Sequence, residues 1–546
     1  MRTIRSKTLW VLLATVCLAA PARAQLSDGE ILDNIQHAAF NFFWNEANPT
    51  LGMIKDRSTA GSPCSIASVG FGLSSICVGV DHGWVTRDDA RQRVYNTLHT
   101  FYTWPQGTAT SGTIGYRGFF YHFLDMNTGF RMPGWDPELS TIDSALLMAG
   151  ILDAGAYFTD PDDTTEVAIR TMADSLYNRM DWTFFRNGTQ RLYMGWKPGG
   201  GGFSGFGQWQ GYNEAMILEI EALGSTTFKV DTTLWNPGWT STYSFGTQYG
   251  YSYIIFPPLF GHQYSHCWID FRNIQDAYMR NPTHGITYAE NTRRATLAQH
   301  AYCIADPAHW TGYSDSLWGI TAGDDPVLGY TARGAPPPQT DNGTLSPTAV
   351  AGSLPFAPEV CMPTLRNMYN NYPLLWGTYG FKDAFSLSKG LSGGPPPWYD
   401  TDFLGIDQGP IVMMIENYTG EGIWKRFMQI PAIQNGLTRA GFIPASNTTA
   451  VGSPPALTSA VALAASEPSP IAGRGILRFR LAQAGRVRLV LYDARGRQER
   501  VLIDDQRPAG EGSVALDAAG LRQGVYLARI ETAAGSAARK VVVLDR

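Results

Sequence analysis

The stretch Gly405-Ile-Asp407-Gln-Gly-Pro-Ile-Val412 opens an apolar run and carries a carboxylate at its third residue. Two other stretches have the same plan: Ser140-Thr-Ile-Asp143-Ser-Ala-Leu-Leu147 and Gly211-Tyr-Asn-Glu214-Ala-Met-Ile-Leu218. Each predicts a helix that is apolar almost all round and has one acid in or near its first turn. Because such helices must be buried on every side, we expect them at the centre of a helical domain.

Further helical runs are spread between Gln25 and Pro444, without any alternation of strands and helices. About a dozen helices fit there, which argues against a doubly wound sheet and favours an all-α (α/α)6 toroid, six helical hairpins around one axis. The predicted helices begin near Ser27 and Thr86 and cover Ser140–Tyr157, Thr165–Met180, Tyr212–Leu223, Tyr288–Ile304, Ala357–Tyr369, Gln408–Tyr418 and Gly422–Gln429.

Residues 1–24 have the features of a secretory signal peptide. Arg2, Arg5 and Lys7 precede an apolar run from Leu9 to Ala20, and Ala22-Arg23-Ala24 is a small-x-small cleavage site. The run is too short to span a bilayer, and no later stretch approaches the ~20 apolar residues of a membrane helix. We therefore expect an exported protein without membrane insertion, located in the periplasm, at the cell surface or outside the cell.

Composition changes near residue 450. The segment from Gln25 to Ala465 has 24 basic against 38 acidic residues, a net charge of −14, and it holds every Trp after the signal peptide. This charge argues against a nucleic-acid-binding surface, and the richness in aromatic residues favours a neutral ligand with flat apolar faces. The five cysteines after residue 24 are expected to be buried thiols.

The C-terminal part predicts a small all-β sandwich. Residues 445–470, rich in Ser, Thr, Ala and Pro, predict a linker, so the expected domains are residues 25–444 and 471–546. The alternating runs that predict strands are Ile476–Leu481, Val487–Tyr492, Val514–Leu516, Val525–Ile530 and Val541–Leu544.

Two short patterns in this sandwich, Leu491-Tyr-Asp-Ala-Arg-Gly496 and Gly524-Val-Tyr-Leu-Ala-Arg529, resemble bacterial C-terminal sorting domains of the type IX secretion class. The resemblance implies the secretion machinery as a partner of this domain. A stabilising or spacer module is the alternative.

The acids of the three apolar helices carry the chemistry. In a toroid the inner helices run the same way, so Asp143, Glu214 and Asp407 would meet in one cup. Glycoside hydrolysis needs such a set, because one carboxyl protonates the leaving oxygen and another activates water or attacks carbon. The alternative, an acid that only complements a helix dipole, explains one such acid better than three. A general acid at this position needs burial or a neighbouring carboxylate to raise its pKa.

Sugar rings stack on aromatic side chains, and their hydroxyls bind charged and amide groups. The alternative for each aromatic residue is a place in the core, and Asp270 with Arg272 would then be a buried ion pair. The predicted substrate-binding residues are Trp196, Trp209, Tyr212, Tyr264, His266, Trp268, Arg272, Trp318 and Asp341. We expect no cofactor and no metal, since solvated loop acids explain Asp324-Asp325 as well as a Ca²⁺ site does.

Several blocks resemble the bacterial glucoamylase-like family, which includes the β-1,2-glucanases of glycoside hydrolase family 144 and part of the cyclic β-1,2-glucan synthases. The blocks run from about Ile31 to Gly441 and include Gly211-Tyr-Asn-Glu214-Ala, Ala301-Tyr-Cys-Ile-Ala-Asp306-Pro, Trp318-Gly-Ile-Thr-Ala, Asp341-Asn-Gly-Thr-Leu-Ser-Pro-Thr and Asp407-Gln-Gly-Pro-Ile-Val-Met-Met-Ile-Glu416-Asn417-Tyr418.

The resemblance implies an (α/α)6 barrel, inverting hydrolysis without metal, catalysis by Glu214 and Asp407, and a place near the scissile bond for Asp143. The segment His262-Gln-Tyr-Ser-His266 is more similar to the synthase-linked branch of the family than to its characterised glucanases. The expected function is therefore an exported glycoside hydrolase that cleaves β-1,2-glucan, with Glu214 as acid and Asp407 as base. The alternatives are another glucan linkage and a non-catalytic glucan-binding protein of the surface. A polysaccharide lyase would need a basic cleft, which the body charge disfavours.

Overall fold

The computed structural model describes residues 26–336, 340–445, 461–463, 471, 473–481, 483–493, 497–532 and 535–543. The predicted signal peptide and most of the predicted linker lie outside these residues. Internal contacts divide the chain into two units. The first comprises residues up to 269 with 295–354 and 359–440, and the second comprises 270–294, 355–358 and 441–546. The domain boundaries expected at 444 and 470 stay predictions.

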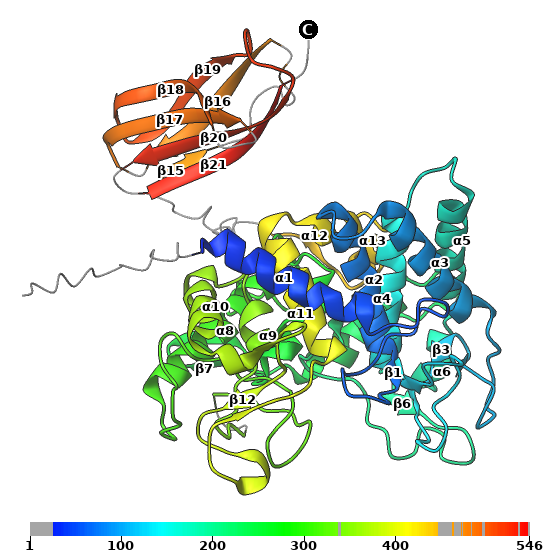
Figure 1. Ribbon diagram of the computed structural model, residues 1–546. Coiled ribbons are helices and arrows are strands. Elements are labelled where there is room, and N and C mark those ends of the chain that lie inside the picture. Colours follow the sequence, from blue (N-terminus) through cyan, green and yellow to red (C-terminus); the bar gives the residue numbers. More distant parts are fainter. Residues whose placement is uncertain are drawn as a thin grey trace, which may run out of the picture. The chain divides into compact units, whose positions relative to one another are not determined.

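Helices dominate the chain up to residue 440 (Figure 1). They are α1 (Asp28–Asn45), α2 (Ile66–Asp81), α3 (Arg87–Thr103), α4 (Thr141–Tyr157), α5 (Thr164–Asn178), α6 (Trp182–Arg186), α7 (Met216–Gly224), α8 (Tyr288–Ala305), α9 (Pro347–Ala351), α10 (Pro358–Asn371), α11 (Gly405–Thr419), α12 (Gly422–Phe427) and α13 (Pro431–Arg439). The predicted helices are present, but α7 begins at Met216 and not at Tyr212. Its entry is a turn in which the Asn213 side chain accepts a hydrogen bond from Ala215 N at 2.9 Å.

Four helices of the first unit, α2, α4, α7 and α11, are buried along almost their whole length. Helix α2 packs against α4 and α11, and α4 packs against α7. Two glycines let α2 and α4 approach closely, because a Cβ at Gly70 would lie 2.1 Å from Leu146 O and one at Gly150 would lie 2.1 Å from Gly70 O. Other helices cover this inner set, with α1 on α2 and α11, α5 on α4, and α13 on α7.

Sequence reasoning missed α2, although it is central to this packing. Its run of Ile, Val, Phe, Gly and Ser has no polar face, so no helical period is visible. Tertiary burial stabilises this helix where local propensity does not, since Gly residues weaken a helix interior by ~1 kcal/mol each.

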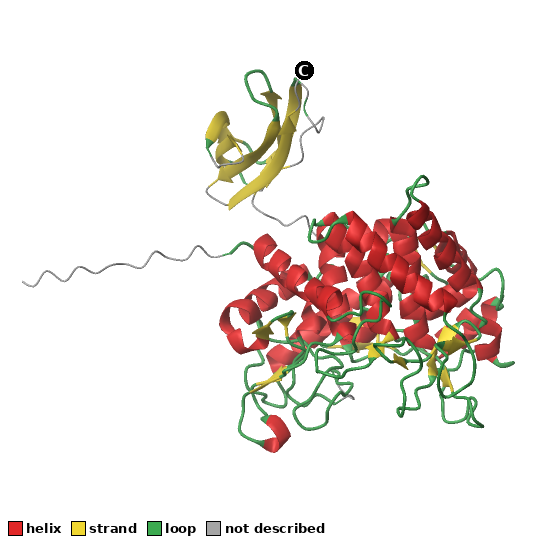
Figure 2. Ribbon diagram, turned by 45° about the vertical axis from the view of Figure 1, so that its right-hand side comes forward, coloured by secondary structure: helices red, strands yellow, loops and turns green. Residues whose placement is uncertain are grey.

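Loops and short ladders gather along one side of the helices (Figure 2). Several ladders directly precede an inner helix: β1 leads into α2, and β5 leads into α4. The ladders are β1 (Cys64–Ser65) with β4 (Phe123–Leu124), β2 (Gly115–Tyr116) with β3 (Phe119–Phe120), β5 (Leu139–Ser140) with β6 (Gly195–Trp196), β7 (Phe245–Gln248) with β8 (Tyr251–Ile254), β10 (Trp376–Gly377) with β11 (Gly380–Phe381), and β12 (Phe385–Ser386) with β13 (Trp398–Tyr399). The N-termini of α2 and α4 therefore lie among the loops.

The second unit contains the C-terminal β-region. One sheet has the order β15-β16-β19 and the other β18-β17-β20-β21, and apolar residues of both sheets form one core. The strands are β15 (Val461–Leu463), β16 (Arg474–Leu481), β17 (Gly485–Asp493), β18 (Gln498–Arg507), β19 (Gly510–Asp517), β20 (Gly524–Thr532) and β21 (Gly535–Val543), and β9 (Ile274–Gln275) pairs with β14 (Ile443–Pro444) in the same unit. Strand β18 was not predicted, because charged residues interrupt its apolar alternation.

Two further expectations concern the cysteines and membrane-spanning helices. The thiols of Cys64, Cys77 and Cys303 are buried, as predicted, and burial raises the pKa of each. Within the described ranges, no helix has the length and apolar character needed to cross a membrane.

Candidate active site

Asp143 lies in the first turn of α4, where Ser140 caps the helix. The Ser140 hydroxyl accepts a hydrogen bond from Asp143 N at 3.3 Å and itself donates to Oδ2 of Asp143. Next to this cap, Trp209 Nε1 donates to Thr141 Oγ1 at 2.9 Å. The cap therefore fixes both the backbone and the carboxylate of Asp143, which is 6% exposed.

Glu214 lies two residues before α7, and one hydroxyl holds this junction. Ser265 Oγ donates to the Glu214 carbonyl at 2.7 Å and accepts from Ile217 N at 2.9 Å. Burial raises the pKa of the half-buried Glu214 side chain to about 7, and the negative charge of Asp143 contributes to that rise. Glu214 therefore holds its proton close to neutral pH, as a general acid must.

Asp407 lies in the first turn of α11 and is 2% exposed. Thr348 of α9 donates to its carbonyl at 2.9 Å, and the neighbouring Gln408 donates to Phe381 O at 2.9 Å. The Asp407 carboxyl is hydrogen-bonded to the Asp383 carboxyl, which requires that one of the two carries a proton. Burial, together with the negative charge of Asp383, raises the pKa of Asp407 well above its usual value.

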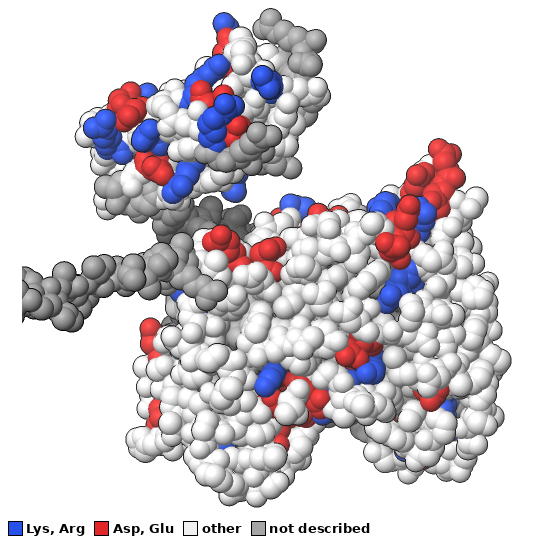
Figure 3. All heavy atoms as spheres, viewed as in Figure 1, with Lys and Arg blue, Asp and Glu red and all other residues white. Residues whose placement is uncertain are grey.

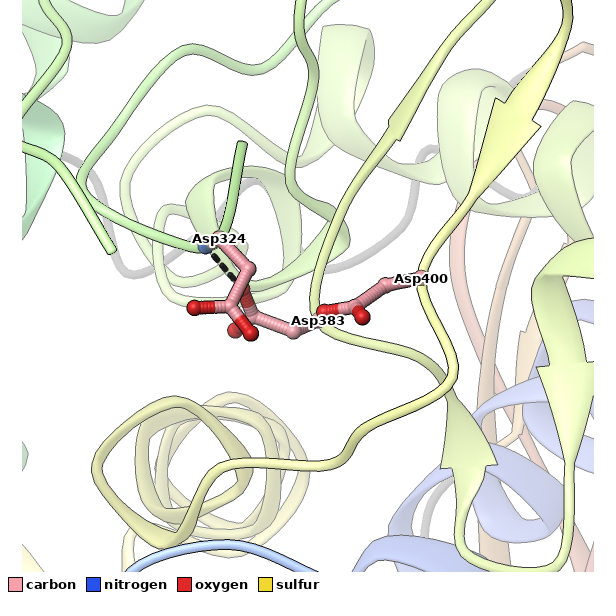
Figure 4. A group of neighbouring side chains, drawn as sticks. All are labelled: Asp324, Asp383 and Asp400. Atoms are coloured by element: carbon pink, nitrogen blue, oxygen red, sulfur yellow. Dashed lines mark hydrogen bonds between the residues drawn. The ribbon is translucent and has the colours of Figure 1, made fainter. Parts of the chain in front are cut away.

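Three more buried acids, Asp324, Asp383 and Asp400, form a carboxylate cluster next to Asp407 (Figure 4). Each offers an oxygen within 4.8 Å of the others, an arrangement that could hold a metal ion. One oxygen of each is engaged: Asp383 Oδ2 accepts from Asp324 N at 2.6 Å, Asp400 Oδ1 from Thr401 N at 2.6 Å, and Asp324 Oδ2 from an arginine. The other oxygens of Asp324 and Asp400 receive no hydrogen bond from the described residues, whereas the Asp383 carboxyl is hydrogen-bonded to Asp407.

The charge of this cluster is only partly balanced. Arg57 donates to Asp324 at 2.8 Å and lies 3.5 Å from Asp402. Arg333 is 1% exposed and donates to Gly323 O at 3.0 Å, and its charge counteracts part of the rise in the pKa of Asp383. Burial is the larger effect, so the pKa values of Asp383 and Asp400 remain above the usual range. Asp383 and Asp400 therefore retain protons at pH values where ordinary aspartates are ionised.

Tyr264 connects the acids. It is 3% exposed, and burial together with the charges of Asp407 and Glu214 raises the pKa of its hydroxyl. Burial is the largest cause of this rise, and the two charges add to it because charge interactions inside a protein are little screened by solvent. The charge of Asp143 acts in the same way on Glu214, so electrostatic interactions link Asp143 to Glu214, and Glu214 and Asp407 to Tyr264.

The structure places several of the predicted sugar-binding residues in the core. Trp268 and Trp318 are fully buried, His266 is 1% exposed, and Trp268 Nε1 donates to Ser74 Oγ at 2.9 Å. A stacking platform needs an open ring face, which Trp268 and Trp318 lack here.

The remaining predicted sugar-binding residues differ in their burial and in their contacts. Trp196 is half-buried and stacks on Tyr116 with ring centroids 5.4 Å apart. Tyr212 is buried against the His262 ring at 4.8 Å. Asp341 accepts hydrogen bonds from the Tyr302 and Tyr313 hydroxyls at 3.0 and 2.8 Å. In the second unit, Arg272 pairs with Asp270 at 2.8 Å, the ion pair foreseen as the alternative.

Sequence reasoning missed several charged residues of this region: Asp383, Asp400, Arg57, His122 and Glu138. Most lie in loops whose local sequence has no period, so nothing in the chain marks them as neighbours. The one signal was the pair Asp324-Asp325, of which Asp324 belongs to the cluster.

A helical body that gathers a protonated glutamic acid and several carboxyl groups beside the start of its buried helices has the make-up of a glycoside hydrolase. Comparison with known proteins agrees. The family model described as "Putative glucoamylase" matches residues 207–431. A crystal structure from Bacteroides uniformis with the same description is 33% identical, with a TM-score of 0.69, over 77% of this chain and 99% of that one. The chain belongs to the glucoamylase-like family.

Two further relatives have more specific names. An exo β-1,2-glucooligosaccharide sophorohydrolase (non-reducing end) from Parabacteroides distasonis is 28% identical over 445 residues, 76% of this chain. The matched part is 58% of that relative's length. An endo-β-1,2-glucanase from Chitinophaga pinensis, crystallised with sophorotriose and glucose, is 28% identical with a TM-score of 0.69, over 77% of this chain and 99% of that one. These relatives are named as glycoside hydrolases that act on β-1,2-linked glucans.

Proposed function

We propose that the chain is an exported glycoside hydrolase that cleaves β-1,2-glucan with inversion, on a body built as an (α/α)6 toroid. The observation that carries this proposal is Glu214, which keeps a proton near neutral pH beside Asp143 and is linked electrostatically to Asp407 through Tyr264. The names of the relatives support the linkage, because an exo-acting and an endo-acting protein share it.

In this mechanism Glu214 gives its proton to the leaving glycosidic oxygen, and Asp407 takes a proton from the water that attacks the anomeric carbon. The raised pKa of Asp407 in the free protein must fall for this step. The ionised form of Asp407 is stabilised when the attacking water donates a hydrogen bond to its carboxylate and when Asp383 keeps its proton, because a charged Asp383 raises the pKa of Asp407.

The experiment is incubation of purified protein with linear β-1,2-glucan, with α-1,4- and β-1,3-glucans as comparison substrates. We expect new reducing ends only from the β-1,2-glucan, and NMR of the first products should find the α-anomer, as inversion requires. Sophorose as the sole early product would indicate exo action, and a ladder of lengths would indicate endo action. Activity only on a glucan of another linkage would refute the assignment of β-1,2-glucan as the substrate. Binding without hydrolysis would favour a glucan-binding protein.

Export is a separate part of the proposal, supported by the sequence of residues 1–24 and by the C-terminal sandwich with its resemblance to sorting domains. In the source bacterium, N-terminal sequencing of the protein recovered outside the cytoplasm should begin at Gln25. Protein retained inside the cell with Met1 or Arg2 at its N-terminus would refute export. Deletion of residues 471–546 should leave cleavage after Ala24 unchanged but reduce delivery to the cell surface.

A further inference from the structure

His122 lies between two carboxylates at the loop-bearing side of the first unit. Its Nδ1 is 2.9 Å from Oε1 of Glu138, and its Nε2 is 3.5 Å from Oδ2 of Asp143. A neutral imidazole has one N–H donor, whereas an imidazolium has two. The charged form is therefore the only one that can donate towards both carboxylates at once.

The backbone fixes this arrangement from three sides. His122 N donates to the Glu138 carbonyl at 2.9 Å, and the His122 carbonyl accepts from Ile66 N, the first residue of α2, at 3.3 Å. The His122 ring stacks on Phe123 with centroids 4.0 Å apart and an angle of 14° between the planes. The start of α2, the strand that follows Glu138 and the cap of α4 thus hold one imidazole.

His122 and Ser140 both contact the same oxygen of Asp143, Oδ2: Ser140 by a hydrogen bond and His122 as an ion pair. One carboxylate oxygen is thereby held by a cation and a hydroxyl. The other, Oδ1, receives no hydrogen bond from the described residues. This leaves Asp143 fixed in orientation with one free acceptor, next to the Glu214 carboxyl whose pKa it helps to raise.

The charges around His122 agree with this geometry. Burial acts to lower the pKa of His122, but the carboxylates of Asp143, Glu138 and Asp56 outweigh burial and raise it to about 9. Two cations face these acids from neighbouring segments: Arg57 contacts Asp56 at 3.3 Å, and the charge of Lys197 stabilises ionised Glu138.

We propose that His122 is a positioning residue of the hydrolytic site: Glu138 holds its imidazolium, and the imidazolium holds the Asp143 carboxylate in its orientation beside Glu214. The role in catalysis rests on the proposed function. The charged state and the contacts of His122 do not, so the two can be tested apart.

The first test is a titration of the whole protein labelled with ¹³C at histidine Cε1, in which the His122 signal is assigned by its loss in His122→Gln. We expect a pKa near 9 in the native chain. Relative to the ordinary value of 6.5, this corresponds to a preference of about 300-fold for the imidazolium. Glu138→Gln and Asp143→Asn should each weaken that preference at least tenfold. A native pKa at or below 6.5, or no change in either variant, would overturn the proposal whether or not the protein cleaves glucan.

The second test is a double-mutant cycle on kcat and KM for β-1,2-glucan. If His122 acts through Asp143, His122→Gln should lower kcat/KM at least tenfold in the native chain but hardly further in the Asp143→Asn background. Additive losses would mean a general structural role and would overturn the positioning role. His99→Gln on α3, where the ring stacks on Tyr95 at 5.7 Å, is the matched control and should leave the kinetics unchanged. If His122→Gln fails to fold, Glu138→Gln takes its place in the cycle.

Discussion

The raised pKa of Glu214 makes a quantitative prediction about the pH dependence of hydrolysis. With a pKa of about 7, about nine-tenths of the Glu214 side chains carry the proton at pH 6 and about one-tenth at pH 8. A carboxyl at the ordinary value of 4.5 would be only about 3% protonated at pH 6, so burial and Asp143 increase the active form about 30-fold there. The protonated fraction of Glu214 therefore falls about tenfold between pH 6 and pH 8, and kcat/KM, which reports the free protein, should fall by this factor over the range in which Asp407 is already ionised.

The assay is initial-rate hydrolysis of β-1,2-glucan across pH 5 to 9, for the native chain and for Glu214→Gln. The variant should lose at least ~10²-fold in kcat. Its rate should also no longer decline on the alkaline side of the pH profile (the alkaline limb), because the titrating proton is gone. A substrate whose leaving group needs no proton, 4-nitrophenyl β-sophoroside, should recover much of the lost rate. Glu290→Gln, which removes the charge of a half-buried pair with Arg294 on α8, is the matched control. An alkaline limb that persists near pH 7 in Glu214→Gln would refute the assignment of the proton to Glu214.

Three other outcomes are expected. Asp407→Asn should lower kcat at least ~10²-fold without loss of cooperative unfolding, since the amide keeps the shape of the buried acid and can still hydrogen-bond to Asp383; near-native turnover would leave Asp143 as the base. The free energy of unfolding, measured in urea, should fall as pH rises from about 5 to 9. The raised pKa values of Glu214 and His122 mean that the folded chain holds protons that the unfolded chain releases. This stabilisation is present at low pH and is lost as pH rises through about 7 for Glu214 and about 9 for His122. Greater stability at pH 9 than at pH 6 would contradict that sign. A chain of residues 25–448 keeps the pairing of β9 with β14 and should fold and retain its turnover, whereas non-cooperative unfolding would show that the C-terminal sheets belong to the core.

The sequence predicted those features that depend on neighbours along the chain. Helices with a polar face or a cap, such as α4 with Ser140 and Asp143, follow from period and capping residues. The alternating residues of β16 and β20 likewise predict strands whose buried positions fall on one side. The three acids on apolar helices were also identifiable, because a charge on an otherwise buried helix is conspicuous in a local window.

The features that only the tertiary structure decided involve residues far apart in sequence. Helix α2 has no polar face, so only burial against α4 and α11 identifies it. Asp324, Asp383 and Asp400 stand in separate loops, and no local pattern predicts that their oxygens meet within 4.8 Å. The proton on Glu214 depends on burial and on a charge 71 positions away in the chain at Asp143. A pKa is set by the solvent and charges around the folded group, so the sequence could name the acids, but only their packing decides which of them holds a proton at neutral pH.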